Sequence, residues 1–187
     1  MMEFLTSPVK ESDVRSLKVG DIVYITGKIV TGRDEMHLRV IEYLNEGKEI
    51  PENLRGCTLY HCGPILAKTE NGYEPVAAGP TTSARMNSTE SRVIRELGIH
   101  AVIGKGGMSD EVVETMKECG CVYLAATGGA GVTLAEGLAR VSGVEWEDLG
   151  MAEAAWIFDA VRFGPLIVAV DCNGNNLYKD VRDSLKR

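Results

Sequence analysis

The sequence has little of what marks nucleic-acid binders, membrane proteins and secreted proteins. Its 20 Lys and Arg residues stand against 27 Asp and Glu residues, a net charge of −7, and aromatic residues make up only 6%. Phosphate backbones require clustered cations and single-stranded bases require stacking rings, so no nucleic-acid partner is expected. No apolar run approaches the roughly 18 residues of a membrane helix, and the first residues lack the apolar segment of a signal peptide. We therefore expect a cytoplasmic protein without a membrane partner.

Cysteine is scarce and irregularly spaced. The five cysteines are an odd number, and neither the pair at 57 and 62 nor the pair at 119 and 121 matches the spacing of zinc or iron–sulfur ligands. A chain of 187 residues can also bury a core without disulfides. We expect reduced, buried thiols and no metal bound by this chain. The cysteines are Cys57, Cys62, Cys119, Cys121 and Cys172.

The apolar patterns that are present predict one mixed α/β domain over residues 1–187. This length and a hydrophobic content of 44% are typical of a single globular domain. The first half is rich in β-branched runs, and the second half alternates strand, loop and helix, as in parallel sheets covered by helices. We expect a strand-rich N-terminal part packed on a mixed or parallel sheet with flanking helices.

Glycines mark the boundaries of most of the predicted elements. Strands are predicted over 22–30 with a bulge or bend at Gly27, and over 58–61, 101–103, 121–125 and 166–171. A hairpin over 65–78 is predicted to turn at Asn71-Gly72. Helices are predicted over 36–44, 87–97, 112–116 and 134–138, with one or two helical turns over 153–158. Residues 1–20 and the segment after 175 are read as polar stretches.

Three glycine-rich loops share one design, because each follows a predicted strand and opens a predicted helix. They span 79–86, 104–109 and 127–131, and two of them carry a cation, Arg85 or Lys105. Unpaired N–H groups and the helix dipole make such a loop suitable for an anion. Their spacings match neither the P-loop nor the dinucleotide-binding motif. A simple strand-to-helix turn is the alternative for each loop, but three together favour an anion site.

Other polar residues stand near these loops. Arg33 lies between the predicted strand over 22–30 and the next helix, and an exposed Arg is the alternative interpretation. Thr81 and Thr82 offer hydroxyls beside Arg85, although either is also suited to cap a helix. A Thr hydroxyl becomes a base only if cationic neighbours in a dry pocket stabilise its alkoxide. The three histidines are interpreted as satisfied or exposed side chains, and His37 is the one that shares a segment with Arg33.

Taken together, these motifs resemble the β subunit of the iron–sulfur hydro-lyases, a group with class I fumarases and L(+)-tartrate dehydratases. The resemblance runs in order over nearly the whole chain, and its two central motifs are long and specific. The motifs are Thr31-Gly32-Arg33-Asp34, His61-Cys62-Gly63-Pro64, Gly79-Pro80-Thr81-Thr82-Ser83-Ala84-Arg85-Met86, Val102-Ile103-Gly104-Lys105-Gly106-Gly107-Met108, Phe163-Gly164-Pro165-Leu166-Ile167-Val168 and Gly174-Asn175-Asn176-Leu177.

The resemblance implies a fold, a reaction and a partner. The fold is a swivelling β/β/α domain, and the reaction is the reversible dehydration of a 2-hydroxy dicarboxylate, such as (S)-malate to fumarate. A [4Fe–4S] cluster is held by the α subunit and not by this chain, and the α subunit supplies the general acid. The length of the chain fits a separate β subunit, and an α2β2 assembly or a β-dimer is expected.

The resemblance also assigns roles to individual residues. Substrate binding falls to Arg33, Thr81, Thr82, Arg85, Lys105, Gly106 and Gly107, and Thr81 and Lys105 are the catalytic pair, with Thr81 the candidate base for the C3 proton. The chemistry agrees, because Arg suits bidentate carboxylate binding and nearby cations stabilise charge that develops beside a carboxylate.

The substrate and the class of function leave alternatives. The run over 127–131 favours a fumarase over an L(+)-tartrate dehydratase, which is the second hypothesis. A hypothesis from another class is a free-standing anion- or nucleotide-binding module. A purely structural swivelling domain is the third.

Overall fold

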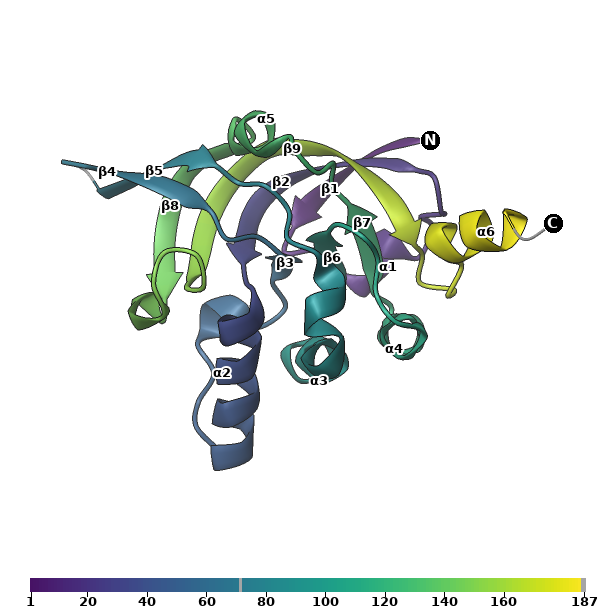
Figure 1. Ribbon diagram of the computed structural model, residues 1–187, viewed down its shortest axis with the longest axis horizontal. Coiled ribbons are helices and arrows are strands. Elements are labelled where there is room, and N and C mark those ends of the chain that lie inside the picture. The colour runs from purple at the N-terminus through teal and green to yellow at the C-terminus, as the bar shows by residue number, and fades with distance from the viewer. Residues whose placement is uncertain (71, 186–187) are drawn as a thin grey trace.

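The computed structural model describes residues 1–70 and 72–185, and its centre is a seven-stranded mixed sheet (Figure 1). Neighbouring strands from β1 to β7 run parallel, whereas β9 runs antiparallel to β2, β7 and β8. Because β9 also pairs with β2, the strands β2, β3, β6, β7 and β9 form a closed ring. In spatial order the strands are β1 (Met2–Ser7), β2 (Ile22–Thr31), β3 (Thr58–Tyr60), β6 (Ala101–Gly104), β7 (Val122–Ala125), β9 (Ala155–Val170) and β8 (Leu138–Glu145).

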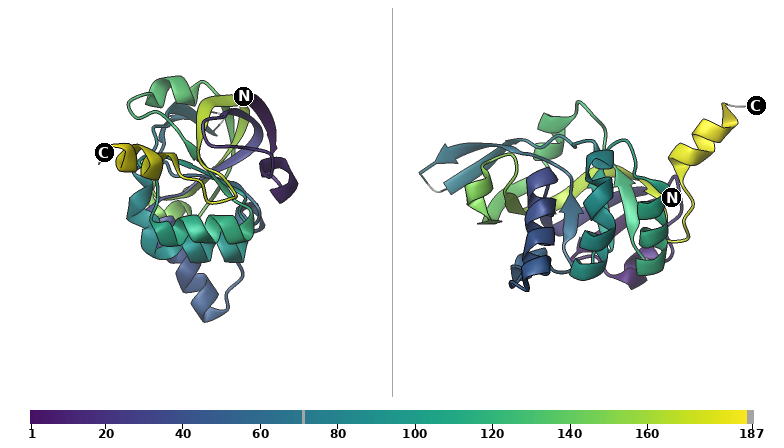
Figure 2. Two further views of the ribbon diagram at one scale, coloured as in Figure 1. Left: turned by 90° about the vertical axis from the view of Figure 1, so that its right-hand side faces the viewer. Right: turned by 60° about the horizontal axis from the view of Figure 1, so that its bottom comes forward.

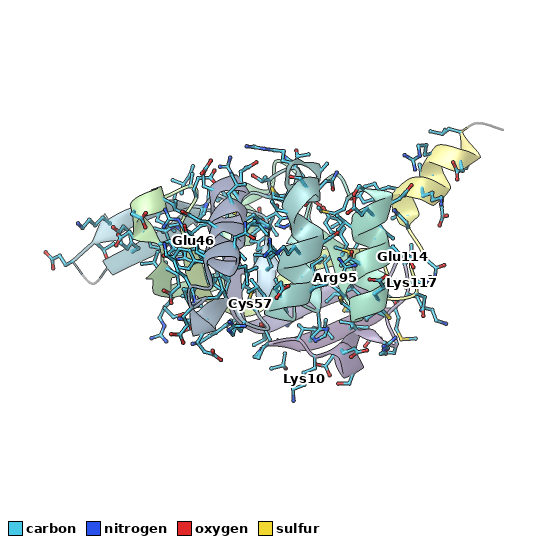
Figure 3. The ribbon with its side chains drawn as sticks, turned by 90° about the horizontal axis from the view of Figure 1, so that it is seen from below. Lys10, Glu46, Cys57, Arg95, Glu114 and Lys117 are labelled. Atoms are coloured by element: carbon cyan, nitrogen blue, oxygen red, sulfur yellow. The ribbon has the colours of Figure 1, made fainter. Side chains whose placement is uncertain are left out.

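Three helices cover one side of this sheet: α2 (Asp34–Glu46), α3 (Asn87–Leu97) and α4 (Asp110–Cys119) (Figures 1 and 2). Each ends where the sequence predicted, at a glycine in the left-handed conformation, with φ of 66° at Gly47, 66° at Gly98 and 61° at Gly120. A left-handed residue closes the last helical turn, and glycine adopts it without a Cβ penalty. The outer side of the helical layer carries exposed charges, including Arg95, Glu114 and Lys117 (Figure 3).

Alternate residues of the strands fill two separate hydrophobic clusters. Along β9, Trp156 and Phe158 enter the cluster enclosed by the curved sheet, and Ala155 and Ile157 enter the one beneath the helices. This two-residue period follows from the pleat of a strand, which sends successive side chains to opposite faces. Burial on both faces explains why the strands read as nearly continuous apolar runs.

The remaining elements surround this core. The predicted hairpin is present as β4 (Ile65–Thr69) and β5 (Gly72–Ala77), although Asn71 of its turn lies outside the described residues. It projects at the end of the molecule opposite α6 (Leu177–Ser184) (Figures 1 and 2). No helix in the described ranges is long and apolar enough to cross a membrane. The short elements are α1 (Glu11–Val14), η1 (Glu52–Leu54), η2 (Ser83–Met86), α5 (Gly131–Ala135) and η3 (Glu147–Leu149).

The mixed α/β class is confirmed, but several predicted elements are wrong. The helix predicted to reach Leu138 stops at Ala135, where β8 follows, and the helical turns predicted over 153–158 are the start of β9. The pairing of this segment with both β2 and β8 supplies the hydrogen bonds that make it a strand. The prediction of a strand-rich N-terminal part is also incomplete, because the long strand β9 comes from the C-terminal half of the chain and closes the sheet by pairing with β2.

Two polar stretches also contain regular structure. Residues 2–7 form β1 by parallel pairing with β2, and the polar tail contains α6. The Asn176 side chain caps α6 by accepting from the N–H groups of Tyr178 and Lys179, a local signal that the sequence already carried.

A substitution at Gly27 tests the close backbone contact between β1 and β2. The φ of Gly27 is +116°, and a Cβ there would lie 2.3 Å from the carbonyl oxygen of Ser7. Gly27→Ala should lower the free energy of unfolding by about 2–4 kcal/mol, because strain and a backbone clash combine. Gly20→Ala is the control, since φ is +92° there but no atom lies within 4 Å of a new Cβ. Equal losses for both variants in urea denaturation would contradict the close approach.

Candidate functional site

The site begins where four neighbouring parallel strands end. β2, β3, β6 and β7 lie side by side in that order, and their carboxyl ends lead to Arg33, His61, Lys105 and the loop over 126–130. The carboxyl ends of neighbouring parallel strands lie at one edge of the sheet, so the loops that follow them converge there. The arrangement therefore brings segments together that are far apart in the sequence.

Thr81 and Thr82 join the edge through backbone pairing. The N–H of Thr81 donates to the carbonyl of His61 at 2.7 Å, and the N–H of Lys105 donates to the carbonyl of Thr81 at 3.3 Å. The N–H of Ser83 in turn donates to the carbonyl of Lys105 at 3.0 Å. The two threonines and Lys105 are thus held as neighbours by a short parallel bridge.

Gly106 and Gly107 shape the loop that carries Lys105. Their φ angles are +82° and +76°, which any residue with a side chain adopts only with strain. A Cβ on Gly107 would lie 2.7 Å from the ring of Tyr178, and one on Gly106 would meet Thr82 at 3.6 Å. Glycine is therefore required at Gly107, because the first residues of α6 pack directly on the loop.

Arg85 is held by a carboxylate of a different element. Its Nε donates to Asp34 Oδ1 at 3.1 Å, and its Nη2 lies 2.8 Å from Asp34 Oδ2. Asp34 is the first residue of α2, and Arg85 lies in η2 with half of its side chain exposed. One hydrogen bond and one ion-pair contact thus hold the guanidinium and leave part of it open to solvent, although Asp34 Oδ2 itself accepts no hydrogen bond from the described residues.

Arg33 lies on the other side of the same carboxylate. Its Nε is 4.0 Å from Asp34 Oδ2 and 3.3 Å from Glu153 Oε1. Glu153 also accepts from the N–H of Glu35 at 3.0 Å, so it holds both Arg33 and the first turn of α2. Arg33 joins Arg85 through Asp34, and among the described side chains no carboxylate lies within 4 Å of Lys105.

The three glycine-rich loops lie against one another. The N–H of Ala126 donates to the carbonyl of Gly104 at 2.8 Å, and a Cβ on Gly128 would lie 3.6 Å from the Lys105 stem. A Cβ on Gly131 would lie 3.4 Å from the Cα of Gly79. The loops over 79–86, 104–109 and 127–131 thus form one surface that carries Arg85 and Lys105.

The sequence missed a buried polar cluster beneath these loops. His37, His61 and Glu90 are completely buried, and the nitrogen and oxygen atoms with which they could bind a metal ion lie within 4.8 Å of one another. The sequence predicted satisfied or exposed histidines, with His37 able to line the same site as Arg33. His37 is indeed satisfied, but Glu90 was not singled out. A signal existed, because Glu90 precedes Val93, Ile94 and Leu97 by three, four and seven residues and therefore occupies the buried face of α3.

The thiols of this chain do not fit an iron–sulfur cluster. Cys57 and Cys121 belong to the hydrophobic cluster under the helices, whereas Cys62 and Cys172 belong to the one inside the sheet. Burial raises the pKa of the Cys57 thiol to about 12 and that of Cys62 to about 12. All five cysteines are free, as predicted, but they are distributed over opposite faces of the sheet rather than around one centre.

The fold and the edge define a class of α/β protein that carries cations in glycine-rich loops at the carboxyl ends of parallel strands. Residues 3–181 match the family described as Fumarase C-terminus, and the chain belongs to that family, which includes β subunits of class I fumarate hydratase type.

Three relatives illustrate the family. A protein of Methanocaldococcus jannaschii named "Putative L(+)-tartrate dehydratase subunit beta" is 46% identical over 96% of this chain and 93% of its own length. The L(+)-tartrate dehydratase subunit beta of Escherichia coli is 40% identical over 95% of this chain and 87% of its own length. The "Putative fumarate hydratase class I" of Geobacillus stearothermophilus is 41% identical over 96% of this chain, but only 34% of that longer protein is matched.

Thiol chemistry tests the assignment of the cysteines. At pH 8 a thiol whose pKa is near 12 is ionised in about one molecule in 10,000, so Cys57 and Cys62 should not react with a disulfide reagent in the native protein. Cys119 is the partly exposed cysteine and should react first, although burial raises its pKa as well. A colorimetric titration should find one slow thiol before unfolding, none in Cys119→Ser, and five in the unfolded wild type. Several fast native thiols would contradict this assignment.

Proposed function

We propose that this chain is the β subunit of a hydro-lyase that reversibly dehydrates a 2-hydroxy dicarboxylate. The first candidate reaction is the conversion of (S)-malate to fumarate. Family membership supports the class of reaction. The observation that carries the proposal is the convergence of Arg33, Arg85 and Lys105 at the carboxyl edge of the sheet, beside Thr81. Several cations from separate loops are what a doubly negative substrate requires.

In the proposed mechanism the substrate carboxylates bind to Arg33, Arg85 and Lys105. Asp34 and Glu153 hold the two guanidinium groups in position, so a substrate carboxylate joins prepared ion pairs rather than free side chains. Thr82 and the backbone of Gly106 and Gly107 complete the binding surface. These contacts orient the C3–H bond of the substrate toward the Thr81 hydroxyl oxygen.

Thr81 acts as the base in its alkoxide form and takes the C3 proton. The C–O bond at C2 breaks, and the departing hydroxyl leaves as water after receiving a proton from an acid of the α subunit. The positive charge of Lys105, whose backbone is paired with Thr81, lowers the cost of the alkoxide and of the charge that develops on the substrate.

The reaction needs a partner. Because the cysteines of this chain do not fit a cluster, we assign the [4Fe–4S] cluster to the α subunit, with an α2β2 assembly or a β-dimer as the arrangement. The names of the relatives as β subunits support such a partner. We further propose that residues 1–187 are one domain of the swivelling β/β/α type, and that the enzyme works in the cytoplasm, where its free thiols stay reduced.

L(+)-tartrate is the second candidate substrate. The two relatives that match over most of their own length are named L(+)-tartrate dehydratase β subunits, whereas the loop over 127–131 favours malate. The loop lies against the Lys105 side chain, since a Cβ on Gly128 would lie 3.6 Å from it. The ratio of kcat/KM for the two substrates decides between them.

Reconstitution tests the need for a partner. The purified chain should show no dehydration of either substrate alone, and activity should appear with an α subunit after anaerobic cluster assembly. Absorbance of the product double bond measures the rate. Turnover by the chain alone would contradict the proposal, and ATP, NAD or phosphate binding by calorimetry would favour the free-standing binding module.

The planar fork of Arg85 provides a sharper test. Arg85→Lys keeps the charge but loses the two-point contact, so kcat/KM of the reconstituted enzyme should fall about 100-fold, or about 2.7 kcal/mol. Arg95→Lys is the matched control, because Arg95 pairs with Glu118 on the outer face of α3 (Figure 3). Near-normal turnover of Arg85→Lys would refute the assigned role, and an equal fall in both variants would point to a structural cause.

A further inference from the structure

The buried cluster beneath the loops is linked into a continuous chain of polar contacts. His37 Nε2 lies 2.8 Å from Glu90 Oε2, and His61 Nε2 lies 3.2 Å from the same oxygen. On its other side, His61 Nδ1 lies 2.8 Å from Ser83 Oγ, which lies 2.8 Å from the Tyr123 hydroxyl. All five side chains are 0% exposed. They come from α2, α3, η2, β7 and the residue after β3.

The network touches the backbone of the site loops at several points. His37 Nδ1 lies 2.7 Å from the carbonyl oxygen of Arg33. Toward the other end, the backbone N–H of Ser83 donates to the carbonyl of Lys105 at 3.0 Å. In the middle, the carbonyl of His61 accepts the N–H of Thr81. The buried chain therefore touches each of the three loops that carry Arg33, Thr81 and Lys105.

The chemistry of the groups fixes where the protons lie. His37 Nδ1 must carry a proton, because the carbonyl of Arg33 can only accept one. A proton also lies between His37 Nε2 and Glu90, so His37 is an imidazolium paired with a carboxylate. Burial by itself lowers the pKa of His37, but Glu90 outweighs it and raises that pKa above the ordinary 6.5. Contacts with His61 and His37 hold the pKa of Glu90 well below its usual range against the opposing effect of burial.

His61 Nε2 faces the same carboxylate oxygen of Glu90, although its direction falls short of hydrogen-bond geometry. Ser83 Oγ lies between His61 Nδ1 and the Tyr123 hydroxyl, within hydrogen-bond distance of both.

The network is packed tightly against the strand that leads to Lys105. A Cβ on Gly104 would lie 2.0 Å from Ser83 Oγ, 3.0 Å from the Tyr123 hydroxyl and 3.3 Å from His61 Nδ1. Only glycine leaves room for these contacts at the end of β6. A buried ion pair contributes little net stability compared with well-packed apolar groups, so stability alone does not account for this arrangement.

We propose that His37, Glu90, His61 and Ser83 are positioning residues, whose buried network holds the Arg33, Thr81 and Lys105 loops in the relative placement that the substrate requires. This inference rests on the proposed hydro-lyase function. The network does not touch the substrate, and it acts through the backbone of the residues that do. Misplacement of reacting groups by about 1 Å lowers rates about 100-fold, so a small shift of one loop suffices.

A metal ion is the competing occupant of the cluster, since two imidazoles and a carboxylate are common metal ligands. The proton assignment argues against it, because each Nε2 faces the same carboxylate oxygen and His37 is already charged. Metal analysis of the purified chain therefore belongs to the test.

Glu90→Gln and His37→Asn break the ion pair, and Ser83→Ala breaks the far end of the network while leaving the ion pair in place. In the reconstituted enzyme, kcat/KM should fall about 10- to 100-fold in each variant, with the global unfolding transition retained in Ser83→Ala. His100→Gln is the matched control, because its Nδ1 contacts Gly120 outside the network. Wild-type kcat/KM in all three variants would overturn the proposal.

Two readouts do not depend on activity. The pKa of His37, followed by imidazole NMR shifts, should lie above the ordinary 6.5 in the wild type and in Ser83→Ala, and it should fall in Glu90→Gln, where the carboxylate is lost. Amide exchange at Thr81 and Lys105 should accelerate at least tenfold in Ser83→Ala and not in His100→Gln. These readouts remain valid if the wild-type complex dehydrates neither substrate, an outcome that refutes the proposed function alone. Unchanged exchange, or one equivalent of zinc or iron lost in His37→Asn, would overturn the network.

Discussion

A single buried carboxylate imposes the strictest requirement on this structure. Glu90 has no exposed surface, and a charge in such a place must find its compensation inside the protein. The compensation comes from His37 on another helix and from His61 after a strand, so the start of α3 is fixed relative to both. The segments that carry Arg33, Thr81 and Ser83 are the immediate neighbours of these side chains. The proposed positioning of the loops at the sheet edge depends on this one ionic contact and the hydrogen bonds around it.

The parallel strands supply the other half of the arrangement. β2, β3, β6 and β7 bring four loops to one edge, and close packing between those loops is possible because glycines stand at their contacts. Gly104 leaves space for the buried network, and Gly107 leaves space for Tyr178 of α6. The glycine-rich character of the loops is thus explained as much by what lies beneath them as by a ligand above them.

The two arginines enter this edge already paired. Asp34 lies between Arg85 and Arg33, and Glu153 holds Arg33 from the other side. Guanidinium groups fixed by carboxylates lose little further freedom when a substrate binds, which is how a preorganised site limits the entropy cost of association. Lys105 differs, since in the described part of the chain no acid lies within ion-pair distance of it. An acidic chain with net charge −7 therefore carries a local surplus of positive charge at this edge.

The sequence by itself determined the features that depend on a few neighbouring residues. The apolar period and the terminal glycines set α2, α3 and α4, the hairpin follows from a local turn, and the motifs around Arg33, Thr81, Arg85 and Lys105 were sufficient to identify the family. Tertiary structure decided what depends on distant partners. The start of β9 is a strand because β2 and β8 pair with it, and residues 2–7 form the strand β1 because they pair with β2. Glu90 contacts His37, which lies 53 residues away in the sequence. Hydrogen-bond partners and compensating charges that lie this far apart leave no local pattern, so only the folded chain brings them together.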